Sequence, residues 1–164
     1  MNRLIPIFLF LFFDIIICVA QEAHFGWAKK FGGTGDERGN DLTVDQASNV
    51  LMTGSFTGLA DFDPSPGNSI HVSKGMDDIF IEKLDSNGDL VWIRTIGATG
   101  DDRGRSIKAD AAGNVYVTGT FTGKVDFDPG PTSFEITGKT PVDNFIIKLN
   151  SAGDFLWAKS FGDI

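Results

Sequence analysis

Apolar and polar residues alternate along most of this chain in short runs, which are separated by clusters of glycine, asparagine, aspartate and serine. The run at 78–84, Asp-Ile-Phe-Ile-Glu-Lys-Leu, is typical in its content of β-branched and aromatic residues. Such runs bounded by turn residues indicate strands. Beyond the N-terminal apolar stretch, no window has the 3.6-residue apolar period of an amphipathic helix. The pattern predicts four strands in the first half of the chain, at 39–45, 50–57, 78–84 and 90–96.

The same pattern returns at a fixed offset of 65 residues. The sequence Thr-Gly-Ser-Phe-Thr-Gly at 53–58 reappears as Thr-Gly-Thr-Phe-Thr-Gly at 118–123, and Trp27, Trp92 and Trp157 have the same spacing. Residues 27–91 and 92–156 align without a gap, and 30 of the 65 positions are identical. A gapless period of this length indicates a repeat architecture rather than two unrelated domains.

Four antiparallel strands joined by tight turns form a propeller blade. We therefore predict an all-β fold of β-propeller-type repeats, with two four-stranded antiparallel blades plus one extra N-terminal strand at 25–31 that copies the fourth strand. Two tandem β-sandwich domains are the alternative. A unit of 65 residues is short for an independent sandwich, which has about 100 residues.

The predicted organisation is a signal peptide at 1–20, a leading outer strand and linker at 21–38, a first blade at 39–103, and a second blade with the start of a third unit at 104–164. Two blades do not close a ring, so both outer blade faces and one strand edge would remain open. We expect either a fragment of a longer repeat protein, which the stop just inside a third unit favours, or self-association of several copies through the open blade faces.

The N-terminus has the layout of a cleaved secretory signal, with Arg3 before an apolar run at 4–19 and Ala20 before polar residues. Asp14 interrupts the run, which is shorter than the about 20 residues of a membrane helix. We expect an exported protein, secreted or at the cell surface, without a stable membrane span after cleavage. An uncleaved anchor and a lipoprotein acylated at Cys18 are the alternatives. Cleavage removes the only cysteine, so the mature chain would depend on core packing without disulfides.

The formal net charge of −8 argues against nucleic acid or anionic lipid as a partner, because both require basic patches. It is compatible with solubility and with binding of cations. The expected partner is therefore an unidentified protein or glycan ligand, and not nucleic acid.

The segment Asp-Ala-Ala-Gly-Asn-Val-Tyr-Val-Thr-Gly-Thr at 110–120, preceded by Asp101, resembles the signature of the bacterial β-propeller repeat called SBBP. Gly-Asp-Glu-Arg-Gly at 35–39 and the segment from Phe80 to Trp92 fit the same pattern. The resemblance implies a propeller fold and no catalytic residues. It also implies a part of a large exported surface protein, often from bacteria of the Bacteroidetes type, with many repeats and a C-terminal sorting domain. This chain differs in having few repeats and no such domain before Ile164.

Paired aspartates are the best metal candidates in the chain: Asp61, Asp63, Asp126 and Asp128. In the sequence Asp-Phe-Asp-Pro, the two carboxylates lie on one side of an extended segment and the phenylalanine between them points into the blade. Carboxylates with nearby backbone carbonyls suit Ca²⁺, which takes six to eight oxygen ligands. The alternative, which we favour, is that the aspartates cap a turn that proline fixes.

Three other features receive structural interpretations. Asp-Ser-Asn-Gly-Asp at 85–89 resembles the start of a calcium loop, but Ile96 stands where the last acidic ligand belongs, so a hairpin turn is expected. Arg38 and Arg103 are expected to bridge neighbouring blades rather than to form a ligand site. The three tryptophans are expected to seal packing between blades, with stacking on a sugar as the alternative.

We predict a non-catalytic, exported scaffold that binds a ligand or protein. The alternatives are a lectin, in which two-blade protomers assemble into a closed propeller with sugar sites between blades, and a fragment of a propeller enzyme. The loops at 58–77 and 123–142 are the expected binding surface.

Overall fold

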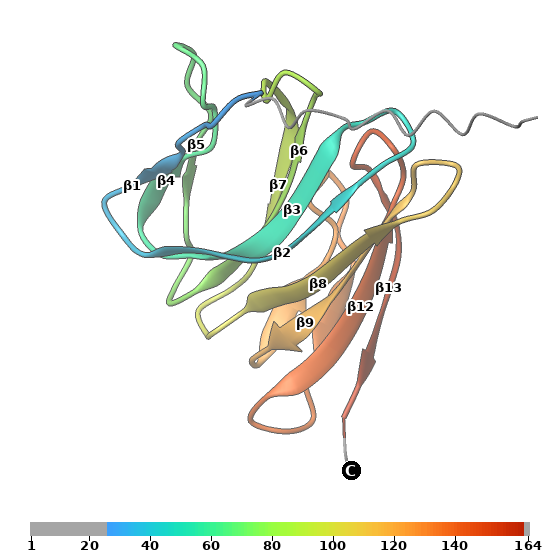
Figure 1. Ribbon diagram of the computed structural model, residues 1–164. Helices are drawn as coiled ribbons and strands as arrows, with labels where there is room; N and C mark the ends of the chain where they lie inside the picture. Colours follow the sequence, from blue (N-terminus) through green and yellow to red (C-terminus); the bar gives the residue numbers. More distant parts are fainter. Residues whose placement is uncertain (1–25, 163–164) are drawn as a thin grey trace, which may run out of the picture.

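The computed structural model describes residues 26–162, which fold into two four-stranded antiparallel sheets, one small three-stranded sheet and one two-stranded ribbon (Figure 1). The first sheet has the order β2-β3-β6-β7 and the second has the order β8-β9-β12-β13. The strands are β1 Gly32–Gly33, β2 Glu37–Val44, β3 Val50–Phe56, β4 Leu59–Asp61, β5 Ile70–Val72, β6 Asp78–Leu84, β7 Leu90–Ile96, β8 Arg103–Ala109, β9 Val115–Phe121, β10 Lys124–Asp126, β11 Glu135–Thr137, β12 Asp143–Leu149 and β13 Phe155–Phe161.

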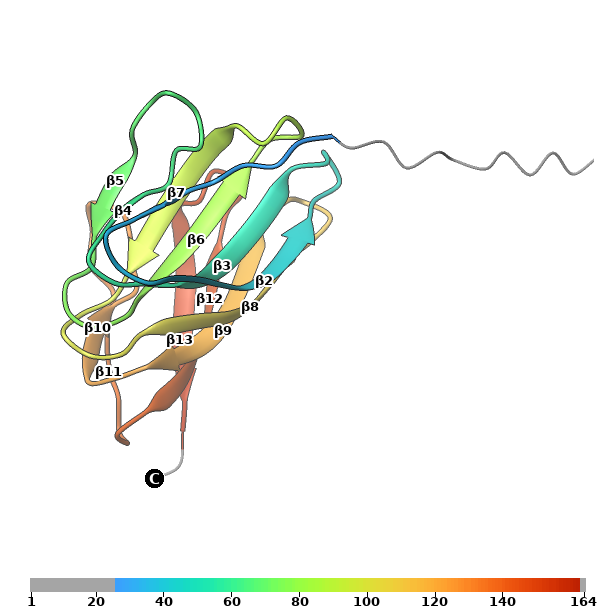
Figure 2. The same cartoon turned by 60° about the vertical axis from the view of Figure 1, so that its left-hand side comes forward.

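The two sheets confirm the predicted all-β fold of propeller-type blades. Blade 1 is β2-β3-β6-β7 and blade 2 is β8-β9-β12-β13, and they lie face against face (Figure 2). Strands β6 and β7 have the predicted bounds, whereas β2 begins two residues earlier than predicted, at Glu37. The predicted signal peptide at 1–20 lies outside the described residues.

The predicted N-terminal strand at 25–31 is wrong for the part that the structure describes, because 26–31 have no strand pairing. A strand needs a partner, and within residues 26–162 no sheet precedes blade 1 to pair with this segment. Only Gly32 and Gly33 pair, with Asp61 and Ala60 of β4. We call residues 26–33 the leader.

The long loop at 58–77 is not irregular throughout. It contains the hairpin β4–β5, and the second repeat has the equivalent β10–β11. Each hairpin folds back beside its blade, which places the Asp-Phe-Asp-Pro sequences at the end of a short strand.

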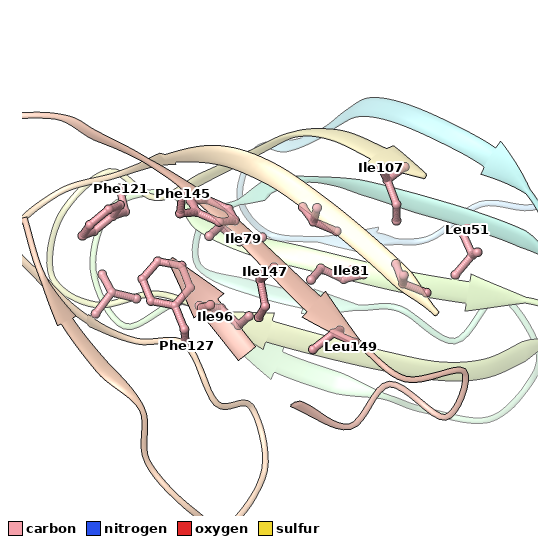
Figure 3. Packing of buried hydrophobic residues seen from close by; sticks show 14 of the residues in the cluster. Leu51, Ile79, Ile81, Ile96, Ile107, Phe121, Phe127, Phe145, Ile147 and Leu149 are labelled. Carbon is pink, nitrogen blue, oxygen red and sulfur yellow. The ribbon is translucent and has the colours of Figure 1, made fainter. Parts of the chain in front are cut away.

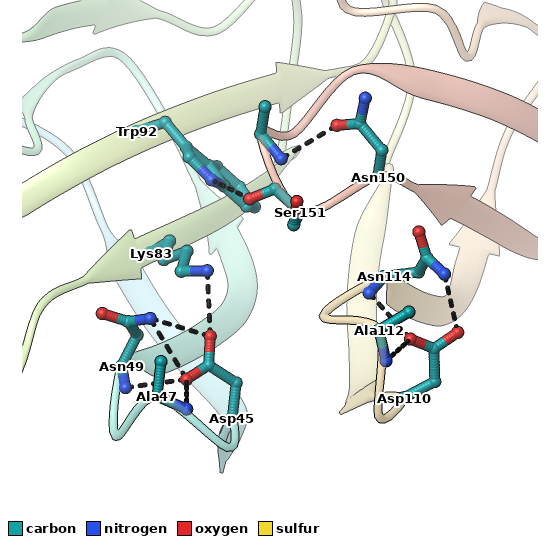
Figure 4. Close-up of polar contacts among 11 residues, drawn as sticks. Asp45, Ala47, Asn49, Lys83, Trp92, Asp110, Ala112, Asn114, Asn150 and Ser151 are labelled. Atoms are coloured by element: carbon teal, nitrogen blue, oxygen red, sulfur yellow. Dashed lines mark hydrogen bonds and ion pairs between the residues drawn. The ribbon is translucent and has the colours of Figure 1, made fainter.

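Aspartates fix the inner turn of each blade. The Oδ1 atom of Asp45 accepts hydrogen bonds from the N–H groups of Ala47 and Asn49, both at 2.9 Å. Asp110 does the same one repeat later, with the N–H groups of Ala112 and Asn114 (Figure 4). Burial alone would raise the pKa of Asp45, but Asn49 and the Lys83 ammonium, 2.9 Å away, lower it to about 2.

The main hydrophobic core lies between the two blades. Blade 1 contributes side chains that include Leu51, Ile79 and Ile81, and blade 2 contributes side chains that include Ile107 and Ile147, all without exposed surface (Figure 3). Because strand side chains alternate, each blade has two faces. We call the face that packs against the following blade the downstream face, and the face that packs against the preceding blade the upstream face. The downstream face of blade 1 and the upstream face of blade 2 form this core.

Among the described residues, no blade packs against the upstream face of blade 1. A smaller cluster of Phe56, Ala60, Phe62, Phe80 and Ile93 forms there, and the leader adds Phe31 to it. The Phe31 ring lies 5.7 Å from that of Phe62 and 6.0 Å from that of Phe80, measured between centroids. The leader therefore covers part of a surface that a preceding blade would cover.

A buried glutamate interrupts this second cluster. Glu82 of β6 has no exposed surface, and neither of its carboxyl oxygens has a hydrogen-bond partner among the described residues. Burial, together with the nearby charge of Asp63, raises the pKa of Glu82 to about 8. The equivalent residue in blade 2 is Ile147, which packs in the main core.

Replacing Glu82 by the residue of the second repeat is expected to stabilise the protein. Glu82→Ile removes an unsatisfied buried polar group, which costs about 1–3 kcal/mol. The folded-state pKa of Glu82 lies above the ordinary value of 4.5, so the stability of the wild type falls as pH rises from about 4.5 to about 8. The advantage of Glu82→Ile in free energy of unfolding should therefore be larger at pH 8 than at pH 5, measured by urea denaturation.

The matched control is Ile147→Glu, which places the same side chain in the main core and should destabilise the protein at both pH values. An advantage of Glu82→Ile that does not change with pH would show that Glu82 does not titrate in this window.

Candidate functional site

The inner strands of the two blades are joined by polar contacts of Asp41. Its Oδ2 atom accepts hydrogen bonds from the Ser106 hydroxyl at 2.7 Å, the Ile107 N–H at 2.9 Å and the Lys108 ammonium at 3.2 Å. The Ile107 N–H, followed by Ser106 and Lys108, holds the pKa of Asp41 well below its usual range. These contacts attach β2 of blade 1 to β8 of blade 2.

The predicted blade-to-blade bridge is confirmed for one of the two arginines. Arg103 of β8 forms an ion pair with Asp77 of blade 1, with its Nε atom 2.6 Å from Oδ2. Its repeat equivalent, Arg38, lies 3.4 Å from Asp36 of its own segment, and both side chains are largely exposed. The difference follows from position, since within residues 26–162 no blade precedes blade 1 to supply an equivalent of Asp77.

Two of the three tryptophans, Trp92 and Trp27, also connect one unit to the next, as predicted. The Trp92 indole N–H of β7 donates to the Ser151 carbonyl in the β12–β13 turn of blade 2, at 3.1 Å (Figure 4). Trp27 of the leader makes the equivalent contact with the Ser86 carbonyl of blade 1, at 2.9 Å. Gly88 and Gly153 lie under these rings with φ of 78° and 81°, and a Cβ atom there would come within about 3 Å of the indole.

A cleft of about 670 Å³ opens between the blades. Blade 1 lines it with residues of β5 and β7, and blade 2 lines it with the β10–β11 loop and the start of β13. Its volume lies within the range of ligand pockets. The cleft is the candidate binding site of the described chain.

Some of the polar groups that line the cleft already make hydrogen bonds within the protein. Arg94 donates to the carbonyls of Gly153 at 2.9 Å and Ala152 at 3.0 Å, so its guanidinium mainly joins the blades. His71 lies 3.3 Å from the Thr95 hydroxyl, and burial, followed by the charge of Arg94, lowers its pKa, which keeps the ring neutral at pH 7.

Two carboxylates and an aromatic pair complete the cleft. Asp128 and Asp154 line it, and Phe155 lies at its edge with its ring 5.1 Å from that of Phe134. Together with the single guanidinium of Arg94, the carboxylates give this lining a negative balance. The cleft therefore suits a neutral or cationic ligand with an apolar face.

The predicted metal residues are placed separately, one pair in each repeat. Asp61 Oδ1 accepts from the N–H groups of Asp63 at 3.0 Å and Ser69 at 2.8 Å, and Asp126 Oδ1 accepts in the same way from Asp128 and Phe134. Phe62 and Phe127 are fully buried between them, as predicted. The carboxylates thus order the tips of the β4–β5 and β10–β11 hairpins, which is the capping role that the sequence favoured.

Asp128 faces the inter-blade cleft, whereas Asp61 and Asp63 face a smaller pocket of about 160 Å³ against the leader. Within residues 26–162 no group of three histidine, cysteine or acidic side chains is arranged to hold a metal ion. Calcium binding at these aspartates stays a prediction. In the same part of the chain, no helix is long and apolar enough to cross a membrane.

Sequence reasoning missed the cleft because most of its distinctive residues do not recur. His71 corresponds to Ile136, Phe155 to Leu90 and Phe134 to Ser69. A search for positions where the two repeats disagree would have identified these residues, together with Glu82. The turn at 85–89 is a hairpin, as predicted, in which the Asp85 carboxylate accepts from the N–H groups of Asn87 and Asp89.

Comparison with known protein families agrees with this architecture. Residues 91–123 match the model of the SBBP family, described as a beta-propeller repeat. The match covers β8 and β9 of blade 2 together with most of β7.

Two curated proteins are similar in sequence. An uncharacterized WD repeat-containing protein, L264, of Acanthamoeba polyphaga mimivirus is 31% identical over 91% of this chain, which spans 12% of that protein. The regulatory protein FlaEY of Caulobacter vibrioides is 28% identical over 56% of this chain, which spans 10% of its length. The chain thus corresponds to a small part of each relative.

The capping role predicts different effects for two substitutions of Asp61. Asp61→Asn keeps an oxygen that can accept from the N–H groups of Asp63 and Ser69, whereas Asp61→Ala leaves both groups without this acceptor. We expect Asp61→Ala to cost about 1–2 kcal/mol of stability and Asp61→Asn to remain near the wild type, by thermal denaturation. Equal losses in both variants would contradict a capping role.

Calcium titration of the same proteins tests the metal prediction. If the aspartates bind Ca²⁺, the ion raises the melting temperature of the wild type, and Asp61→Asn combined with Asp63→Asn reduces the rise. No shift in the wild type would remove the calcium hypothesis.

Proposed function

We propose that this chain, which carries an SBBP beta-propeller repeat, is part of a non-catalytic scaffold that is exported to the cell surface or beyond and works by binding through its open blade faces. The repeat scaffold follows from the fold and the family match. Binding, the absence of catalysis and export are the proposed parts. The partner that these faces fit is another blade of the same kind.

The observation that supports binding is the exposure of positions that are buried one repeat away. On the upstream face of blade 1, Leu42 is 58% exposed, whereas its equivalent in blade 2, Ile107, is fully buried against blade 1. Val44 is 57% exposed beside it. Neighbouring exposed apolar side chains, at a position that the other repeat buries against a blade, support an interaction site here.

The downstream face of blade 2 also exposes positions that are buried one repeat away. Phe161 is 55% exposed, whereas its equivalent in blade 1, Ile96, is 1% exposed in the main core. Val142 is also exposed, whereas its equivalent, Asp77, is buried beside blade 2. The two open faces are therefore different from each other and complementary, as in a head-to-tail contact.

Charges placed on the upstream face should prevent this contact. We expect the wild type to self-associate in a concentration-dependent manner, and Leu42→Lys with Val44→Lys to weaken association by at least about tenfold, because the contact would bury two unpaired charges. Sedimentation equilibrium measures the association constants.

Val91→Lys is the matched control, since Val91 in blade 1, whose downstream face is covered, and its equivalent Leu156 in blade 2, whose upstream face is covered, both stay about half exposed. Absence of association in the wild type, or equal association in all three proteins, would argue against binding between blade faces.

A second candidate function is a lectin, which the inter-blade cleft favours. Aromatic faces suit the apolar side of a pyranose ring, and carboxylates accept hydrogen bonds from sugar hydroxyls. Phe155, Asp128 and Asp154 supply these groups in the cleft. A ring of two-blade protomers would repeat the cleft in each copy.

The lectin candidate predicts binding of a neutral glycan that depends on Phe155. Phe155→Leu gives the cleft the residue of the first repeat and should weaken binding by about tenfold or more. A glycan array followed by calorimetry on the best ligand tests this, with Leu90→Phe as the matched control. If no neutral glycan on the array binds the protein, the lectin hypothesis is wrong.

A further inference from the structure

Three side chains at alternate positions attach the outer strand of one unit to the next unit. In β7 they are Trp92, Arg94 and Ile96, which lie on one side of the strand because strand side chains alternate. Trp92 donates to the Ser151 carbonyl, Arg94 donates to the Gly153 carbonyl and lies 3.7 Å from Asp154, and Ile96 packs in the core with Phe127 and Phe145. We call this the docking triad of β7.

The leader presents the same triad to blade 1. Trp27 donates to the Ser86 carbonyl at 2.9 Å, and the Lys29 ammonium lies 3.0 Å from Asp89. Phe31 packs on Phe62 and Phe80, the repeat equivalents of Phe127 and Phe145. All three contacts are those of β7, displaced by 65 residues. Blade 1 thus carries a complete acceptor for a docking triad, and the leader occupies it.

A third triad lies on β13 and has no acceptor within the part of the chain that the structure describes. Its residues are Trp157, Lys159 and Phe161. Trp157 makes an edge contact with Tyr116 of its own blade but no indole hydrogen bond within residues 26–162, whereas Lys159 and Phe161 are exposed. The sequences Trp-Ala-Lys-Lys-Phe-Gly of the leader and Trp-Ala-Lys-Ser-Phe-Gly of β13 differ at one position.

We propose that the β13 triad of one copy docks on the blade 1 acceptor of a second copy, and that the leader competes with it for this acceptor. The inference rests on the proposed binding between blade faces and identifies both the partner and its control. The contact that β7 makes with blade 2 is the template, because blade 1 offers the same carbonyl, carboxylate and phenylalanine pair.

Competition follows because one acceptor cannot hold both triads. The leader is attached to its own acceptor and is therefore present at high effective concentration. A second copy binds only when the leader has left, so the apparent dissociation constant is the intrinsic constant divided by the fraction of molecules whose acceptor is free. The leader acts as a built-in inhibitor of assembly.

Weakening the leader should therefore strengthen self-association. Trp27→Ala removes the indole and its hydrogen bond to Ser86 without touching either blade, and we expect a dimerisation constant at least about tenfold more favourable than that of the wild type. Trp27→Ala combined with Trp157→Ala removes the competing triad as well and should lose this gain. Sedimentation equilibrium measures all three proteins, with circular dichroism to confirm equal folding.

The outcomes separate the two proposals. If association is abolished by Leu42→Lys with Val44→Lys but is unchanged by Trp27→Ala, the blade faces bind and leader competition is overturned. If the Trp27→Ala protein associates more strongly than the wild type, and the double variant with Trp157→Ala associates just as strongly, the β13 triad is not the partner. If no protein associates, binding between blade faces fails as well.

A labelled peptide provides a test that is independent of dimer stability. A fluorescent peptide with the sequence of residues 155–162 should bind the Trp27→Ala protein at least about tenfold more tightly than the wild type in anisotropy titrations. The same peptide with alanine in place of Trp157 should bind neither. Equal binding of the first peptide to both proteins would show that the leader does not occupy its site.

Discussion

The structure depends on one constraint: a four-stranded blade has two faces that need cover, and it can cover neither by itself. Within residues 26–162 the constraint is satisfied once, where the downstream face of blade 1 meets the upstream face of blade 2. The polar contacts are secondary to this burial. Asp41, Arg103 and Trp92 all bridge the same interface from its inner to its outer edge. They set the register of the two sheets, and the apolar side chains between them supply the main driving force.

The parts of the fold that were predictable are those encoded locally and repeated. The strands β6 and β7 follow from alternating runs bounded by turn residues, and the offset of 65 residues shows that they form units. The leader was predicted wrongly because its sequence copies a strand, whereas residues 26–31 pair with no strand in the part of the chain that the structure describes. The β4–β5 hairpin was missed for a related reason, since strands of three residues leave little pattern among glycines and prolines.

Repetition also helps to separate building elements from candidate sites. Asp61 and Asp126 recur and make the same hydrogen bonds to hairpin amides, so the fold accounts for both. His71 and Phe155 do not recur, and the structure brings them together in a cleft that exists only because two different blades meet. A cleft of this origin cannot be predicted from either repeat alone. It requires the register between blades, which depends on contacts far apart in the sequence.

Three positions on the two open faces are more polar than their buried counterparts, which bears on how the faces bind. On blade 2, Asn144 and Tyr116 replace Ile79 and Leu51 of the buried downstream face, and on blade 1, Glu82 replaces Ile147 of the buried upstream face. Asn144 and Tyr116 lower the cost of leaving the downstream face of blade 2 uncovered. Glu82, which is buried without a hydrogen-bond partner, reduces the gain from covering the upstream face of blade 1. Interfaces that form and separate are more polar than permanent ones. The sequence of the open faces therefore fits a contact that is reversible, for which a competing leader would be an effective control.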